Sequence, residues 1–176
     1  MGKQIHHRCR CTGEVFTDTQ WYHWLKNHDS HESVFEYNGF RYNINDVCLN
    51  PQKPVEWHNK YCRIIITVSQ SPNGMWDYGY DYTFHQDSGC GGAMFVDKDY
   101  EGYRSQKFAI TSCLKFLKKN LGNILKYKKA VGDDCDDFGN WEKNSTIIPY
   151  LENGMVQIDA LIERYDPRQL DLFENM

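Results

Sequence analysis

The chain has 176 residues, of which 40% are hydrophobic and 15% aromatic. This length suits one domain with a sizeable core, and the apolar content excludes an intrinsically disordered chain. The formal net charge of −4 excludes a global positive field that would recruit nucleic acid, so any such contact must come from a local patch.

The cysteine content and the start of the chain indicate a cellular compartment. The seven cysteines are an odd number, and no charged leader followed by an apolar core opens the sequence. No apolar run approaches the roughly eighteen residues that a membrane span needs. We therefore expect a cytoplasmic protein that has reduced thiols and no contact with a membrane.

The first third of the chain carries turn and cap signals. Residues 4–16 hold β-forming residues toward their end and predict a first strand. Thr17-Asp18 predicts the start of a helix that runs through residue 28, because apolar residues recur there at helical spacing. Asn38-Gly39 then suits the positive φ angles of a tight hairpin turn.

The middle of the chain predicts an antiparallel sheet. Ile64–Ile66 are apolar on both faces, which is typical of a central strand, and the aromatic residues from Tyr78 to Phe84 alternate with small or polar ones. Two antiparallel hairpins in succession indicate a meander. The strands that we expect in one sheet are 34–37, 40–44, 62–69 and 76–84.

Two helices are predicted after the strands. A glycine-rich loop at 88–93 precedes a helix over 105–120, whose apolar face covers one side of the sheet and which Gly122-Asn123 can break. Residues 155–165 predict a last short helix, ended by Pro167. The fold class is therefore α+β, an antiparallel meander of four or more strands with helices on one face. Its order is similar to the α-β-β-β-α order of double-stranded-RNA-binding folds.

One face of the longer helix is basic and offers a nucleic-acid contact. Lys115, Lys119 and Lys126 can neutralise phosphates, and rings of the tyrosine-rich strand could stack on bases. The alternative is that the rings pack under the helix and the lysines only solvate a surface. We expect weak, salt-sensitive binding.

Two histidine and cysteine groups invite a zinc interpretation, because zinc prefers four sulfur or nitrogen ligands. Their spacing lacks the paired knuckles of structural zinc sites, so we expect neither a metal nor another cofactor. The residues concerned are His6, His7, Cys9 and Cys11 in one group and His23, His28 and His31 in the other.

The Gly-Cys-Gly-Gly stretch around Cys90 could expose a nucleophilic thiol near His85. It lacks the Lys-Ser/Thr pair of a phosphate-binding loop, and the glycines could equally serve a turn. We assign no catalytic residue. A cysteine- or zinc-dependent enzyme centred on this loop stays an alternative, as does a plain protein-interaction module.

The sequence near the C-terminus reads Gln169-Leu170-Asp171-Leu172-Phe173. Three apolar side chains there follow a helix-breaking proline, so they lie on a tail that can insert into a partner's apolar pocket. The alternative is that they hold the C-terminus against the body. We expect a single domain over 1–165 and a tail over 166–176.

This pentapeptide resembles the motif with which bacterial replication and repair proteins engage the sliding clamp, Gln-Leu-Ser/Asp-Leu-Phe, and all five positions match. The resemblance implies that Gln169, Leu172 and Phe173 are the anchors. Residues 75–121 are similar to small uncharacterised proteins of bacterial phages and integrative elements and carry no diagnostic catalytic motif. Together these resemblances imply a non-enzymatic accessory protein of DNA metabolism or of a mobile element, which docks on the sliding clamp.

Overall fold

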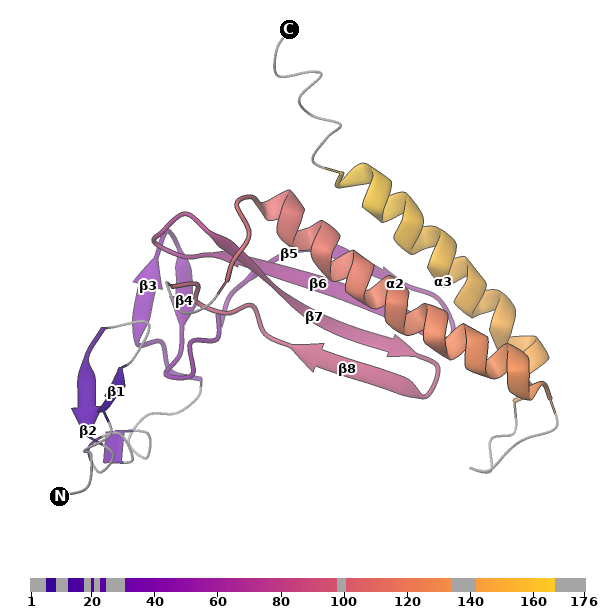
Figure 1. The fold of residues 1–176 in the computed structure, drawn as a ribbon, viewed down its shortest axis with the longest axis horizontal. Helices are drawn as coiled ribbons and strands as arrows, with labels where there is room; N and C mark the ends of the chain where they lie inside the picture. Colours follow the sequence, from indigo (N-terminus) through magenta and orange to yellow (C-terminus); the bar gives the residue numbers. More distant parts are fainter. Residues whose placement is uncertain are drawn as a thin grey trace, which may run out of the picture.

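A four-stranded antiparallel sheet is the centre of the fold (Figure 1). The computed structural model describes residues 6–8, 13–17, 20, 23–24, 31–97, 101–133 and 142–166. Each strand of the sheet pairs with the next in the chain, so the predicted meander is confirmed. The strands are β5 (Gln52–His58), β6 (Cys62–Gln70), β7 (Trp76–Phe84) and β8 (Asp87–Gly91).

The two central strands form where the sequence predicted them. In β6, Ile64 and Ile66 are fully buried against the helices, as expected for a strand with an apolar run. The turn into β7 is closed by the Ser71 amide, which donates to the Met75 carbonyl at 2.9 Å, and Gly74 takes a φ of 80°. Glycine adopts this angle without strain.

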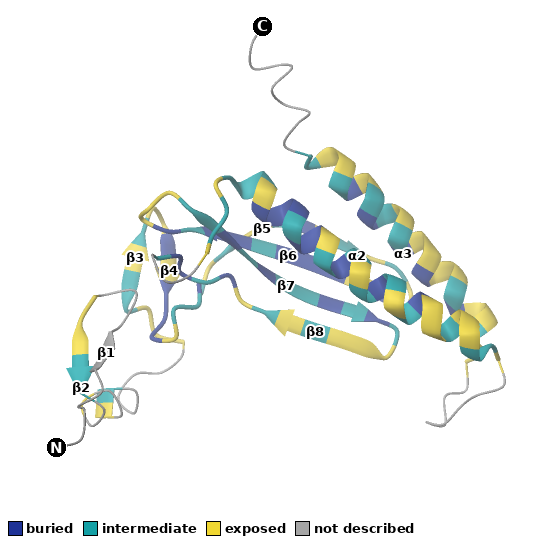
Figure 2. Cartoon of the chain, viewed as in Figure 1, coloured by how far each residue is buried: buried dark blue, intermediate teal, exposed yellow. Residues whose placement is uncertain are grey.

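Both long helices lie on one face of the sheet (Figures 1 and 2). Helix α2 (Gln106–Val131) crosses β6 and β7, and α3 (Asn144–Arg164) runs back along α2. The start of α2 is fixed by Ser105, whose hydroxyl accepts from the Phe108 amide at 3.3 Å. No described helix is long and apolar enough to span a membrane.

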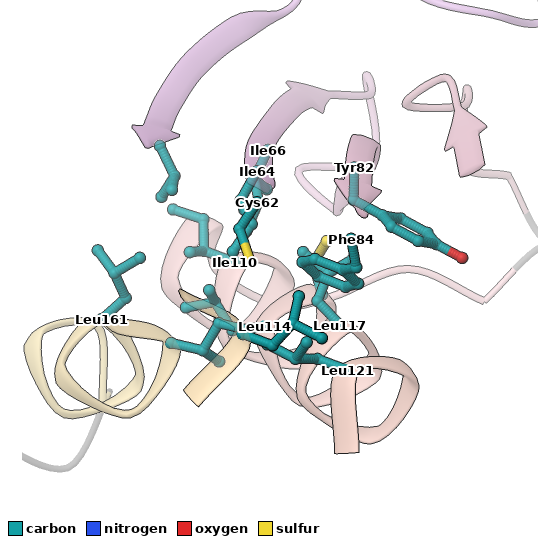
Figure 3. Packing of buried hydrophobic residues seen from close by; sticks show 14 of the residues in the cluster. Cys62, Ile64, Ile66, Tyr82, Phe84, Ile110, Leu114, Leu117, Leu121 and Leu161 are labelled. Carbon is teal, nitrogen blue, oxygen red and sulfur yellow. The ribbon is translucent and has the colours of Figure 1, made fainter. Parts of the chain in front are cut away.

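The main core fills the space between this face and the helices (Figure 3). Alternate residues of β6 and β7 point toward one stripe of α2, because side chains of a strand alternate between its faces. The core residues labelled in Figure 3 are Cys62, Ile64, Ile66, Tyr82, Phe84, Ile110, Leu114, Leu117, Leu121 and Leu161.

The hairpin at Asn38-Gly39 forms as predicted but does not join the main sheet. Its strands β3 (Phe35–Tyr37) and β4 (Phe40–Tyr42) make a separate two-stranded sheet. The two turn residues have φ angles of 48° and 82°. Tyr42 packs edge-on against Phe95, with ring centroids 5.4 Å apart, and this second small core holds the hairpin at one end of the main sheet.

The main sheet takes β5 and β8 in place of the two hairpin strands, which corrects the predicted membership. Strand β5 contains Pro54 and a register shift between Gln52 and Val55, features that suit an edge strand. Strand β8 occupies the start of the stretch that we expected to be a glycine-rich loop.

The two helices are longer than predicted. Helix α2 continues through Gly122 and Asn123, because Gly122 packs against α3 there, and its missing Cβ would lie 3.6 Å from the Met155 methyl carbon. Helix α3 begins eleven residues before the predicted residue 155 and includes Pro149. Pro167, its predicted end, lies outside the described residues.

The N-terminal part forms a short hairpin, β1 (His6–Arg8) with β2 (Val15–Thr17), where one strand was predicted. Thr17 and Gln20 cap each other: the Thr17 amide donates to Gln20 Oε1 at 3.0 Å, and the Gln20 amide donates to Thr17 Oγ1 at 3.4 Å. Trp24 is helical and stacks on Phe16. Gln20 and His23 are helical as well, and residues 18–19, 21–22 and 25–28 of the predicted helix lie outside the described residues.

The chain contains more elements than the α-β-β-β-α order of double-stranded-RNA-binding folds. Two hairpins precede the four-stranded meander, and both long helices follow it. The predicted fold class, α+β with helices on one face of an antiparallel sheet, is confirmed.

Candidate functional site

Polar side chains gather at the end of the main sheet where β5 turns into β6 and β7 into β8. Because Phe84 pairs with Asp87, the second turn consists of only His85 and Gln86. His85 has a φ of 60°, a position where tight hairpins usually place glycine. Histidine tolerates this left-handed conformation better than most residues, so the turn can carry two functional side chains.

A cavity of about 560 Å³ lies between this turn and the second half of α2. The cavity is largely open to the surface, and its volume falls within the range of small-molecule sites, roughly 300–1,000 Å³. The side formed by the sheet is lined by Phe84, Gln86, Asp87 and Ser88. The side formed by the helix is lined by Asn123, Ile124, Tyr127 and Lys128.

The helix side combines one anchored residue with one open residue. Lys128 donates from Nζ to Asn144 Oδ1 at 3.2 Å, which ties the cavity wall to the first residue of α3. Tyr127 is 65% exposed, so its ring is accessible at the rim. The cavity therefore offers an aromatic face together with hydrogen-bond donors and acceptors.

A polar and aromatic network packs on the other side of the same turn. The Tyr61 ring meets His85 at 5.7 Å and Tyr150 at 5.0 Å between centroids, and Lys60 Nζ binds Glu142 Oε1 at 3.1 Å. The Tyr61 hydroxyl and the Lys60 ammonium both lower the pKa of Glu142. Lys60 and Glu142 lie at the surface, so their ion pair adds little stability, and the contact of Tyr61 with Tyr150 links the turns to α3.

The predicted lysines Lys115, Lys119 and Lys126 are exposed, and their spacing places them in one stripe along α2. We call these three residues the lysine ridge. None of them forms an ion pair with another residue that the structure describes.

Other lysines of α2 point toward α3 and are neutralised there. Lys118 pairs with Asp159, and Lys129 pairs with Glu152 at 2.6 Å between Nζ and Oε1. The two faces of α2 therefore differ, since one is neutralised by ion pairs and the lysine ridge keeps its charge.

The tyrosines of β7 are not available to stack on bases. Tyr80 packs on Phe116 with ring centroids 5.0 Å apart, and Tyr82 is buried beneath α2. Burial raises the pKa of Tyr78. The alternative that these rings pack under the helix is thus the correct one, and Tyr127 is an exposed ring near the lysine ridge.

Cys90 is exposed on β8 and pairs in register with Asp81. Asp81 precedes His85 by four residues, about 13 Å along an extended strand, so His85 does not lie opposite Cys90, and we do not assign the two as a nucleophile and base. The neighbouring glycines leave room for rings, since a Cβ at Gly89 would lie 2.8 Å from the Tyr82 ring.

The remaining predicted residues cannot be placed in a site. No group of three His, Cys, Asp or Glu side chains that could hold a metal occurs in the described part of the chain. Cys9, Cys11 and His28 of the histidine and cysteine groups lie outside it. The clamp-binding pentapeptide, Gln169, Leu170, Asp171, Leu172 and Phe173, also lies outside the described residues.

Comparison of the chain with protein-family models, curated proteins and solved structures finds no match. Sequence reasoning missed the cavity, because its two sides come from segments far apart in the chain and neither carries a motif. The usable signal was Tyr127, an aromatic residue between Lys126 and Lys128, although it lies beyond residue 120, where we expected the helix to end.

Proposed function

We propose that this protein is a non-enzymatic accessory factor of DNA metabolism or of a mobile element that docks on the bacterial sliding clamp through its C-terminal pentapeptide. The observation that carries the proposal is the complete match of residues 169–173 to the clamp-binding pattern. In this mode Leu172 and Phe173 enter an apolar pocket of the clamp, and Gln169 makes polar contacts at its mouth.

The body supports this role by fixing the point from which the tail leaves. Tyr165 follows the last residue of α3, and its hydroxyl donates to the Pro54 carbonyl at 3.0 Å. Its own carbonyl accepts from Thr111 Oγ1 at 3.0 Å. The residue just before the tail is therefore held by both the sheet and α2, so a bound tail would tether the whole domain.

A peptide assay tests the proposal. A fluorescein-labelled peptide of residues 166–176 should bind a purified bacterial sliding clamp with roughly micromolar Kd in a fluorescence-polarisation titration, about −8 kcal/mol. Asp171→Ser is the matched control, because the clamp-binding pattern accepts Ser or Asp at that position. Phe173→Ala should remove binding. Equal affinities of the Phe173→Ala and Asp171→Ser peptides would refute the proposal.

A second contact, with the nucleic-acid backbone, is favoured by the lysine ridge. Its three ammonium groups are exposed and carry no ion pair with a described residue, whereas Lys118 and Lys129 do. Unpaired lysines in a row bind phosphates by releasing counterions, without reading sequence. We infer weak binding of nucleic acid next to the clamp.

A further inference from the structure

We propose that the cavity between the β7–β8 turn and α2 binds one unpaired base of a single-stranded nucleic acid whose phosphates lie along the lysine ridge. This inference rests on the proposed backbone contact and is independent of docking on the clamp. Size supports it first, because the cavity of about 560 Å³ is large enough for a nucleoside.

The lining has the chemistry that a base requires. The amide groups of Gln86 and Asn123 each offer a donor and an acceptor, which match the mixed edge of a nucleobase. Phe84 and Ile124 supply apolar surface at the same site. A ligand that is flat and apolar on its faces and polar at its edge fits this combination.

Tyr127 supplies the stacking surface. It lies one helical turn beyond Asn123, so its ring and the Asn123 amide share one side of α2. Its ring is 65% exposed, a large apolar area to leave in water unless a ligand covers it. Stacking on an aromatic ring is open to every base, and it is the main source of affinity in sequence-tolerant single-strand binding.

The charges place the phosphates outside the cavity. Asp87 lines the cavity and repels an anion there, and Lys128 is already bound to Asn144. Lys119 precedes Asn123 by one turn and Lys126 adjoins Tyr127, so both ammonium groups border the outer rim. A strand can therefore lay its backbone on the lysine ridge while one base turns inward.

The bound nucleic acid must be single-stranded. In a duplex the edge of each base is paired and its faces are stacked, so entry into a pocket requires extrusion at a cost of a few kcal/mol. A single strand avoids most of this cost. We therefore expect the full chain to prefer single-stranded over double-stranded nucleic acid.

The test compares two fluorescein-labelled strands of about twelve units, oligodeoxycytidylate and an abasic chain of the same length and charge, in anisotropy titrations with the full chain at low salt. Wild-type protein should bind the strand with bases at least about tenfold more tightly. Tyr127→Ala should weaken that binding about tenfold and leave binding of the abasic strand unchanged.

Phe108→Ala is the control, because Phe108 is also an exposed aromatic residue of α2, at 49%, but lies outside the cavity. It should change neither affinity. Asn123→Ala provides a second cavity variant and should also weaken binding only of the strand with bases.

Three results would overturn the inference: equal wild-type affinity for the two strands, equal losses for Tyr127→Ala and Phe108→Ala, or no saturation with either strand. The last result would also remove the backbone contact. Equal affinities that both vanish on charge reversal of the lysine ridge would remove the base site alone and leave the backbone contact standing.

Discussion

Gly79 occupies a position in β7 where no side chain fits. A Cβ there would lie 2.5 Å from Thr67 Oγ1, 2.6 Å from the Ala93 amide nitrogen and 2.7 Å from the Gly91 carbonyl oxygen. Two of these three atoms belong to the backbone and cannot move without shifting the chain where it leaves β8. The close approach of the segment after β8 to the sheet thus depends on one missing methyl group.

Gly79→Ala should lower the free energy of unfolding by about 1–3 kcal/mol, the usual cost of overpacking. The matched control is Gly122→Ala in α2, where the nearest atom to a new Cβ is 3.6 Å away. That change should raise stability by about 0.5–1 kcal/mol, because alanine favours a helix over glycine. Urea unfolding of both variants checks the opposite signs, and equal effects would contradict this account of the packing.

The thiols differ in reactivity because they differ in burial. Cys62 is almost completely buried, and burial raises its pKa to about 12, so it stays protonated at pH 8. Burial also raises the pKa of the Cys113 thiol. Iodoacetamide at pH 8, followed by peptide mapping, should modify exposed Cys90 and spare Cys62 and Cys113 until urea is added.

The alkylation rate of Cys90 distinguishes a surface thiol from a catalytic one. We expect alkylation no faster than that of glutathione, since the carboxylate of Asp81, which pairs in register with Cys90, is engaged by Arg63. A much faster rate at Cys90 would favour the cysteine-enzyme alternative.

At the scale of elements, the predictions succeeded where the signal is local. Asn38-Gly39 and Ile64–Ile66 specify a turn and a central strand by their own conformational preferences, so neighbours along the chain suffice. Strand β5 was missed because Pro54 and its charged residues, which suit an edge strand, break the alternating apolar pattern that predicts a strand. Strand β8 was missed because its glycines, which make room for rings of β7, look like a loop.

Tertiary contacts explain the errors that remain. Packing on α3 overrides the low helix propensity of Gly122, and a stripe of buried residues in α3 overrides Pro149. The lysine ridge was predictable because exposure of charged residues on a helix follows its period. The cavity was not, because turn and helix meet only in the folded chain.

Helix α2 contributes stability through its inner face and little through its ion pairs. Leu117→Ala should cost about 2–5 kcal/mol, because Leu117 is fully buried in the main core. Lys118→Ala, at the adjacent position, should cost less than about 1 kcal/mol, because both partners of its pair with Asp159 are nearly half exposed. Unfolding at low and at high salt checks the difference. Only the destabilisation caused by Lys118→Ala should decrease as salt rises.

The lysine ridge should carry the salt dependence of nucleic-acid binding. For single strands, each neutralised phosphate contributes about 0.7 to the slope of log Kobs against log salt. Changing Lys115, Lys119 and Lys126 to glutamate should therefore remove binding, whereas Lys119→Gln should reduce the slope by about 0.7. An unchanged slope in Lys119→Gln would show that this lysine only solvates the surface.

Across the whole molecule, the β7–β8 turn and the last turn of α3 lie at opposite ends of the helical layer (Figure 1). The cavity lies beside the end of α2, where Lys128 meets Asn144 at the start of α3. The tail leaves beyond Tyr165, which is bound to Thr111 near the start of α2. The 21 residues of α3 separate the two points by about 30 Å, a spacing that leaves room for both of the proposed contacts at once.

The tethering role predicts an interaction that depends on the tail and not on the stability of the body. Leu172→Ala combined with Phe173→Ala removes the two anchors, and losing a buried Phe alone should cost about 3–5 kcal/mol of binding. In the proposed mode these two side chains bind the clamp and do not pack on the body, so the free energy of unfolding should change little.

Isothermal titration of the full chain into a purified bacterial sliding clamp tests this claim most directly. The account predicts a roughly micromolar Kd for the wild type. For the double variant it predicts no detectable heat of binding and a melting temperature within about 2 °C of the wild type. The contradictory result is unchanged clamp binding by the double variant, or a wild type that does not bind while the double variant melts far lower, as expected of a structural clasp.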